Sequence, residues 1–197
     1  YLRVVFFREP IARVISAYNH VLNDSRDPLH KFLIGKSFED FLSIPELQVE
    51  SCNAQARCII GSAGYNYDDL EDSERIDIAM KFISSLDFVG VTEFFSCSII
   101  EMALRFGKKV PSHFPKANTE ITRFGLSKDL PPELLSKALA CNSLDYKLYN
   151  SVLPIFSNNL LNNFLPRALE TESFAVAKLQ PVYTVSDFDN AFRTVER

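Results

Sequence analysis

Residues 6–18 constrain the fold more than any other part of this chain, because they indicate a buried strand, a tight turn and an amphipathic helix in succession. The run Leu2–Phe7 is short, apolar and rich in β-formers, broken only by Arg3, and its length suits a strand. Pro10 supplies the fixed φ angle that suits the first turn of a helix. The alternation of strand and helix patterns along the chain predicts the α/β class, with a mainly parallel central sheet.

The segment after Pro10 is expected to be a helix with one apolar and one polar face. At about 100° per residue, its apolar residues gather on one side: Ile11, Val14, Ile15, Tyr18 and Leu22. Arg13, Ser16 and His20 fall on the other side. The Ser16 hydroxyl is therefore not required by the core.

Arg8 and Ser16 form a candidate anion site at this turn. A guanidinium at the carboxyl end of a strand offers a bidentate fork for a phosphate, and a hydroxyl from the next helix can complete the oxygen shell. The N-terminus of that helix adds partial positive charge nearby. The alternative is a structural ion pair at the Arg8-Glu9 turn with a solvated Ser16, and the spacing alone leaves both interpretations open.

This segment resembles the 3′-phosphate-binding motif of sulfotransferases that use 3′-phosphoadenosine-5′-phosphosulfate (PAPS), of the carbohydrate type related to heparan sulfate sulfotransferases. In that motif a strand-ending Arg, an Asp-Pro turn and a Ser eight residues after the Arg hold the 3′-phosphate of the cofactor. Arg8 and Ser16 match this spacing, and Glu9 stands in place of the Asp. The resemblance implies that Arg8 and Ser16 bind the cofactor.

Three further segments resemble the same family, in the same order, within residues 2–156. They correspond to its Asn-x-Gln-x-Arg stretch, its later strand with a Gly-x-Thr-Glu turn, and its closing helix with Asp and Leu-Tyr: residues 53–57, 87–93 and 142–149. On a helix Asn53 and Arg57 share a face, so an amide and a guanidinium could grip a sugar hydroxyl or carboxylate. Asn53, Gln55 and Arg57 are thus candidate substrate-binding residues. The alternative is that Gln55 and Arg57 tie loops together by ordinary hydrogen bonds.

The resemblance implies a three-layer fold like that of the P-loop NTPases, N-terminally truncated, with strands at residues 3–7 and 87–91 and with Arg8 ending the first strand. The sulfotransferase-like domain would cover residues 1–166, and residues 167–197 would form a C-terminal extension of unassigned role. In the family, a Pro-Lys-x-Gly-Thr/Ser loop for the 5′-phosphosulfate precedes the 3′-phosphate motif, and the catalytic base usually does too. This chain contains no such loop, so it is expected to be the larger, C-terminal part of an enzyme.

The activity implied is transfer of a sulfuryl group from PAPS to an acceptor hydroxyl, expected on a carbohydrate, with no metal ion and no assigned catalytic residue. The compartment implied is the cytoplasm in a bacterium and the Golgi lumen in a eukaryote. The alternative is a noncatalytic remnant of the fold that serves as a binding or interaction domain. A phosphoryl-transferring P-loop enzyme is disfavoured, because His30 stands where the loop ending in Gly35-Lys36-Ser37 would need its first Gly.

Composition limits the partners. The net charge of −4 argues against a general nucleic-acid-binding surface, so any phosphate site must be local. No apolar run reaches the roughly 18 to 20 residues that span a bilayer, so no membrane anchor is visible. The four cysteines lack the spacing of a metal site. Free, partly buried thiols are expected, with a disulfide conceivable in a lumenal or secreted protein.

Overall fold

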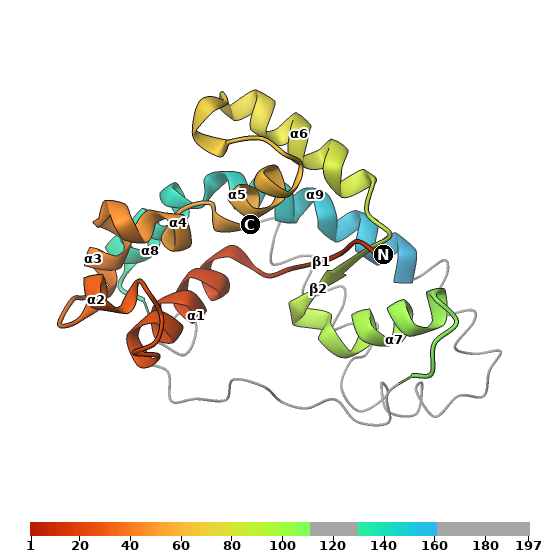
Figure 1. The fold of residues 1–197 in the computed structure, drawn as a ribbon, viewed down its shortest axis with the longest axis horizontal. Coiled ribbons are helices and arrows are strands. Elements are labelled where there is room, and N and C mark those ends of the chain that lie inside the picture. The colour runs from red at the N-terminus through yellow and green to blue at the C-terminus, as the bar shows by residue number, and fades with distance from the viewer. Residues whose placement is uncertain (111–129, 161–197) are drawn as a thin grey trace. The chain divides into compact units, whose positions relative to one another are not determined.

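A computed structural model describes residues 1–110 and 130–160 of the chain (Figure 1). It confirms the α/β class: most of the described residues are helical, and β1 (Val4–Phe7) and β2 (Phe88–Val91) pair in parallel. Both strands lie where the sequence predicts them, and Arg8 directly follows β1. These two strands are the whole sheet within the described residues, so the three-layer architecture stays a prediction. The proposed extension at 167–197 lies outside the described residues.

The helices, in chain order, are α1 (Pro10–Asn23), α2 (His30–Leu33), α3 (Phe38–Ser43), α4 (Gln48–Ser51), α5 (Ala54–Ser62), α6 (Asp72–Ser84), α7 (Phe95–Arg105), α8 (Pro132–Cys141) and α9 (Ser143–Asn159). The chain divides into two compact units. Within the described residues, the strand unit comprises residues 1–6, 88–110 and 150–160, and the helical unit comprises residues 7–87 and 130–149. None of the described helices is both long and apolar enough to cross a bilayer.

The core of the helical unit is built on the apolar face of α1. Ile11, Val14, Ile15 and Tyr18 are buried there, as the periodicity predicts. The Tyr18 ring packs edge-on against two aromatic rings of α3, with centroids 5.3 Å from Phe38 and 5.6 Å from Phe41. Burial of each such side chain contributes about 1.5–3 kcal/mol, so this cluster anchors α1. The polar side of α1 is left for other contacts.

In the strand unit, a glycine of β2 lies against a phenylalanine ring of β1. A Cβ atom added at Gly90 in β2 would lie 2.6 Å from the ring of Phe6 in β1, so only glycine fits there without displacing the ring. The Phe6 ring also packs against Phe88 and Phe95, with centroids 6.0 and 5.6 Å away. The Ser98 hydroxyl of α7 donates to the carbonyl of Val91 and accepts from its N–H, so α7 is fastened to the end of β2.

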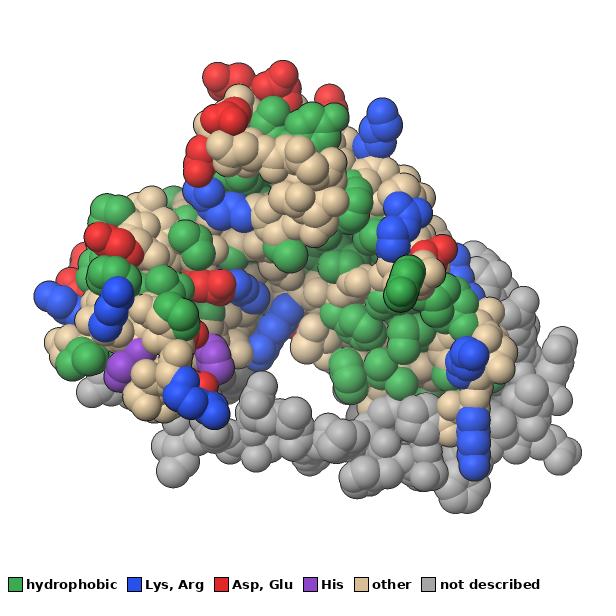
Figure 2. Space-filling model, viewed as in Figure 1, with side chains coloured by type: hydrophobic (Ala, Val, Ile, Leu, Met, Phe, Trp, Pro, Cys, Tyr) green, Lys and Arg blue, Asp and Glu red, His purple; other side chains and the backbone are tan. Residues whose placement is uncertain are grey.

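Exposed carboxylates gather at the beginning of α6 and in the turn before it (Figure 2). They are Asp68, Asp69, Glu71, Asp72, Glu74 and Asp77. Those in the first turn of α6 interact favourably with the positive end of the helix dipole. These carboxylates concentrate part of the chain's net negative charge at α6 and the turn before it. This surface would repel a polyanionic partner.

Candidate functional site

The main chain of Arg8 is held on both sides by one side chain. The Arg8 N–H donates to Gln55 Oε1 at 2.9 Å, and Gln55 Nε2 donates to the Arg8 carbonyl at 2.9 Å. Gln55 therefore hydrogen-bonds both the main-chain N–H and the main-chain carbonyl of Arg8, as a neighbouring strand would in a sheet. These bonds fix the main chain of Arg8 directly after β1 and leave its guanidinium uncommitted.

The Arg8 guanidinium is unusual among the arginines of the helical unit. The others each contact a carboxylate in the pairs Arg13–Glu50, Arg26–Asp24, Arg57–Asp68 and Arg75–Asp72. Arg8 is half-buried, and its guanidinium has no hydrogen-bond or ion-pair partner among residues 1–110 and 130–160. A partly desolvated cation without a counter-charge is a natural site for an anion.

Ser16 lies in the second turn of α1, outside the helix's buried face. Its side chain is half-buried and makes no hydrogen bond to another residue in the part of the chain that the structure describes. Arg8 and Ser16 therefore share two properties, partial exposure and an unused donor. Among the described residues, neither the Arg8 guanidinium nor the Ser16 hydroxyl is used in an internal contact. Both groups are therefore available to a ligand.

Glu9 occupies the N-terminus of α1. Its carboxylate accepts the N–H of Ile11 at 3.2 Å and the N–H of Ala12 at 2.6 Å, and the Tyr146 hydroxyl donates to the same carboxylate. Burial and the adjacent Glu9 carboxylate raise the pKa of Tyr146. The expectation that this helix terminus adds positive charge for a ligand is therefore wrong, because Glu9 takes two of its donors. An anion bound at this turn would therefore have to be held by side chains, and Arg8 and Ser16 are the candidates.

The three candidate substrate-binding residues use their side chains within the protein. Gln55 holds Arg8, as described above. Arg57 donates to Asp68 at 2.9 Å and lies over the Tyr67 ring, 4.1 Å from its centroid. Asn53 is not on a helical face with Arg57, because α5 begins at Ala54 and Asn53 precedes it with a left-handed φ of 49°. These contacts match the alternative interpretation, in which the residues tie segments together.

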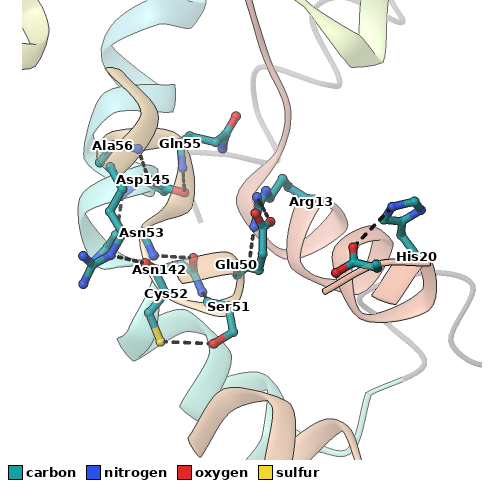
Figure 3. Close-up of polar contacts among 12 residues, drawn as sticks. Arg13, His20, Glu50, Ser51, Cys52, Asn53, Gln55, Ala56, Asn142 and Asp145 are labelled. Carbon is teal, nitrogen blue, oxygen red and sulfur yellow. Dashed lines mark hydrogen bonds and ion pairs between the residues drawn. The ribbon is translucent and has the colours of Figure 1, made fainter. Parts of the chain in front are cut away.

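Asn53 and Asp145 cap each other's helices (Figure 3). The Asn53 Oδ1 accepts the N–H groups of Leu144 and Asp145, at 3.0 and 3.1 Å, at the beginning of α9. The Asp145 carboxylate accepts the N–H groups of Gln55 and Ala56, at 3.1 and 2.7 Å, at the beginning of α5. We call this pair the reciprocal cap. It satisfies four donors that helix termini otherwise leave unpaired.

Asn142 reinforces the reciprocal cap. Its Oδ1 accepts the Asn53 N–H at 3.0 Å, and its Nδ2 donates to the carbonyls of Ser51 and Ala138, both at 2.9 Å. The residues 51–56 are therefore held against the α8–α9 junction, and Gln55 within them holds Arg8. The sequence pattern identifies these segments but not their contacts, because side-chain capping between distant segments has no local periodicity.

The structure gives little support to a histidine base on α1 or to a metal site among the described residues. His20, one turn beyond Ser16, is exposed, and its Nε2 lies 3.6 Å from the Asp27 carboxylate. Within the described residues, no three His, Cys, Asp or Glu side chains are grouped so that they could hold a metal ion.

Comparisons with known proteins add no relative to this description. No protein-family model matches the chain, and searches of curated proteins and of solved structures found no significant match. By its own residues the chain is an α/β protein in which a half-buried arginine follows the first described strand, and the guanidinium of that arginine has no partner among residues 1–110 and 130–160.

Proposed function

We propose that this chain is the 3′-phosphate-binding part of a PAPS-dependent sulfotransferase, with the three-layer, P-loop-like fold of that family. The observation that carries the proposal is the Arg8 guanidinium, which is half-buried directly after β1 and without a partner among the described residues. The spacing of Arg8 and Ser16, which resembles the family's motif, supports the same conclusion.

The proposed ligand group is a phosphate monoester. Such a group is a dianion whose three terminal oxygens can accept several hydrogen bonds at once. The planar guanidinium of Arg8 can donate two parallel hydrogen bonds, and the Ser16 hydroxyl can donate a third. Because Gln55 fixes the Arg8 main chain before any ligand arrives, binding has to order only the Arg8 side chain and not its main chain.

The proposed reaction transfers a sulfuryl group. The bond between sulfur and the bridging phosphate oxygen of PAPS breaks, a bond forms between sulfur and an acceptor hydroxyl, and adenosine 3′,5′-bisphosphate leaves. A base accepts the hydroxyl proton, and donors around the leaving phosphate stabilise its charge. Arg8 and Ser16 hold the far end of the cofactor and so contribute position rather than bond making. The acceptor is proposed to be a carbohydrate hydroxyl, and no step requires a metal ion.

Calorimetric titration with adenosine 3′,5′-bisphosphate tests the binding part of this proposal. Ser16→Ala should weaken binding by about tenfold to one hundredfold, the effect of one hydrogen bond to a charged group. Arg26→Ala is the matched control, because Arg26 is exposed and already pairs with Asp24, and it should leave affinity unchanged. Equal losses in both variants would contradict a specific role for Ser16.

A transfer assay separates an enzyme from a binding domain. Because this chain contains no loop for the 5′-phosphosulfate, it is expected to transfer sulfate slowly or not at all by itself. Labelled PAPS is therefore incubated with the chain joined to a segment that supplies this loop, together with a panel of glycans and simple alcohols, and label in the acceptor is measured. Nucleotide-dependent transfer supports the sulfotransferase. Tight and selective bisphosphate binding with no transfer to any acceptor would instead support the noncatalytic binding domain, and absence of both would overturn the proposal.

A further inference from the structure

Two cysteines that lie far apart in the sequence are brought together at the reciprocal cap. Cys52 directly precedes Asn53, and Cys141 directly precedes Asn142. The N–H of Asn53 and the Oδ1 of Asn142 are joined by a 3.0 Å hydrogen bond across 89 positions of sequence. The two thiols lie near enough for Cys52 to act on the Cys141 thiol, and both are free and half-buried.

The main chain around Cys52 is fixed from both sides. The Asn142 side chain binds the carbonyl of Ser51 and the N–H of Asn53, so the peptide that carries Cys52 is clamped between them (Figure 3). Cys141 is the last residue of α8 and is followed at once by the clamping residue. The main chain that carries the two cysteines is therefore held together by hydrogen bonds.

The surroundings suit a structural pair better than a catalytic thiol. Cys141 ends α8, where the helix dipole disfavours a thiolate. Burial, together with the hydrogen bond and the charge of Cys52, raises the pKa of Cys141 to about 11. The neighbouring polar group is the Ser51 hydroxyl, 3.6 Å from the Cys52 sulfur. The Cys141 thiol is consequently a weak nucleophile, and disulfide formation requires an oxidant.

We propose that Cys52 and Cys141 are a redox pair that forms a reversible disulfide, stapling the end of α8 to the segment before α5. With a small disulfide such as oxidised glutathione, one thiolate attacks a glutathione sulfur and releases one reduced glutathione. The second thiolate then attacks the mixed disulfide and releases the other. The two cysteine sulfurs lose two electrons, the glutathione disulfide gains them, and the two thiol protons end on the released glutathione molecules.

A disulfide between Cys52 and Cys141 would join two residues of the helical unit that lie far apart in the sequence, and so close a long loop of chain. Cross-linking positions this far apart removes much conformational freedom from the unfolded chain, so oxidation should stabilise the fold. The two cysteines are already held near each other, because the Asn142 side chain binds the main chain on both sides of Cys52. The proposal does not depend on the identity of any nucleotide or acceptor, and its test can fail without affecting the proposed function.

Mass spectrometry of the oxidised protein tests the pair directly. The reduced, folded chain is incubated with excess oxidised glutathione, free thiols are blocked with N-ethylmaleimide, and peptides are mapped. The expected result is a cross-linked peptide joining Cys52 and Cys141, with the exposed Cys58 blocked or glutathionylated. The oxidised protein should also melt at least about 5 °C higher than the reduced protein, and dithiothreitol should reverse the difference.

Two serine variants serve as a matched pair. Cys58→Ser should leave the cross-link and the thermal shift intact, whereas Cys52→Ser should abolish both and leave Cys141 open to N-ethylmaleimide. If the folded wild-type protein instead yields Cys52 and Cys141 as separately blocked or glutathionylated residues after prolonged oxidation, the proposal is wrong. The wild-type result decides the question even if a variant fails to fold.

Discussion

At the scale of single residues, a side chain is available to a ligand only if its polar groups are not already hydrogen-bonded within the protein. Gln55 resembles a sugar-binding residue in sequence, yet both ends of its amide bind the main chain of Arg8. Glu9 resembles a motif acid, and its carboxylate caps α1 and accepts from Tyr146. Residue type and spacing predicted that these positions matter. They could not predict the partner, because each partner comes from a distant part of the chain.

The support given by Gln55 leads to a first prediction. In Gln55→Glu the carboxylate can still accept the Arg8 N–H, but it can no longer donate to the Arg8 carbonyl and repels it instead. We expect the free energy of unfolding to fall by about 1–3 kcal/mol, the cost of leaving a buried acceptor unsatisfied. Urea unfolding measures this. Gln48→Glu, the same change on an exposed residue of α4, should cost little, and equal losses in both variants would contradict the role of Gln55.

Glu101 in α7 provides a second prediction, on pH. It is 4% exposed, its Oε2 has no hydrogen-bond partner within the described residues, and burial raises its pKa to about 7 against the opposing charge of Arg105. The folded state therefore holds this proton more tightly than the unfolded state, where Glu titrates near 4.5. The contribution of this group to stability is complete below about pH 4.5 and is lost as pH rises through about 7.

Glu101→Gln remains neutral at every pH and should remove that dependence. Above pH 7 the variant should be more stable than the wild type by about 3 kcal/mol, the value of a shift of this size. Thermal melting from pH 5 to pH 8.5 measures the difference, with the exposed Glu46→Gln as control. Parallel stability curves for Glu101→Gln and the wild type would show that Glu101 ionises normally.

At the scale of elements, local signals predict how helices begin, but not what joins them. Pro10 predicts the first turn of α1, and the structure confirms it. The beginnings of α5 and α9 instead depend on the reciprocal cap, in which Asn53 and Asp145 serve each other's helix. Asn53 can take this place because an Asn tolerates a left-handed backbone conformation better than most residues.

The reciprocal cap gives a third prediction. Asp145 is 1% exposed, so Asp145→Ala leaves the N–H groups of Gln55 and Ala56 without an acceptor, and we expect a loss of about 2–4 kcal/mol in unfolding free energy. Asn53→Ala should cost about 1–2 kcal/mol. Because the two side chains stabilise the same helix junction, the double variant should lose less than the sum, as measured in a double-mutant cycle. Strict additivity would contradict the coupling, and Asp77→Ala, on the exposed face of α6, is the control.

At the scale of the whole molecule, the sequence predicts the α/β class, the two strands and the position of Arg8 at a strand end, and the structure confirms each. Periodicity and turn residues are local, and they determine such features. The proximity of Cys52 and Cys141 lay beyond prediction, because their spacing resembles no known motif and only the folded α8–α9 junction brings them together. The proposed sulfotransferase activity would be a property of the whole molecule, because the phosphate site would have to act together with a base and with donors around the leaving phosphate.

The central claim is that Arg8 recognises a 3′-phosphate. The most direct measurement is the ratio of dissociation constants for adenosine 5′-phosphate and adenosine 3′,5′-bisphosphate, determined by calorimetry for the wild type and for Arg8→Ala. A hydrogen-bonded charge pair is worth about 1.5–3 kcal/mol, so the wild-type ratio should be about ten to more than one hundred. Arg8→Ala should remove most of this preference, with little change in affinity for the 5′-phosphate. A wild-type ratio near one, or a ratio that Arg8→Ala leaves unchanged, would contradict the claim.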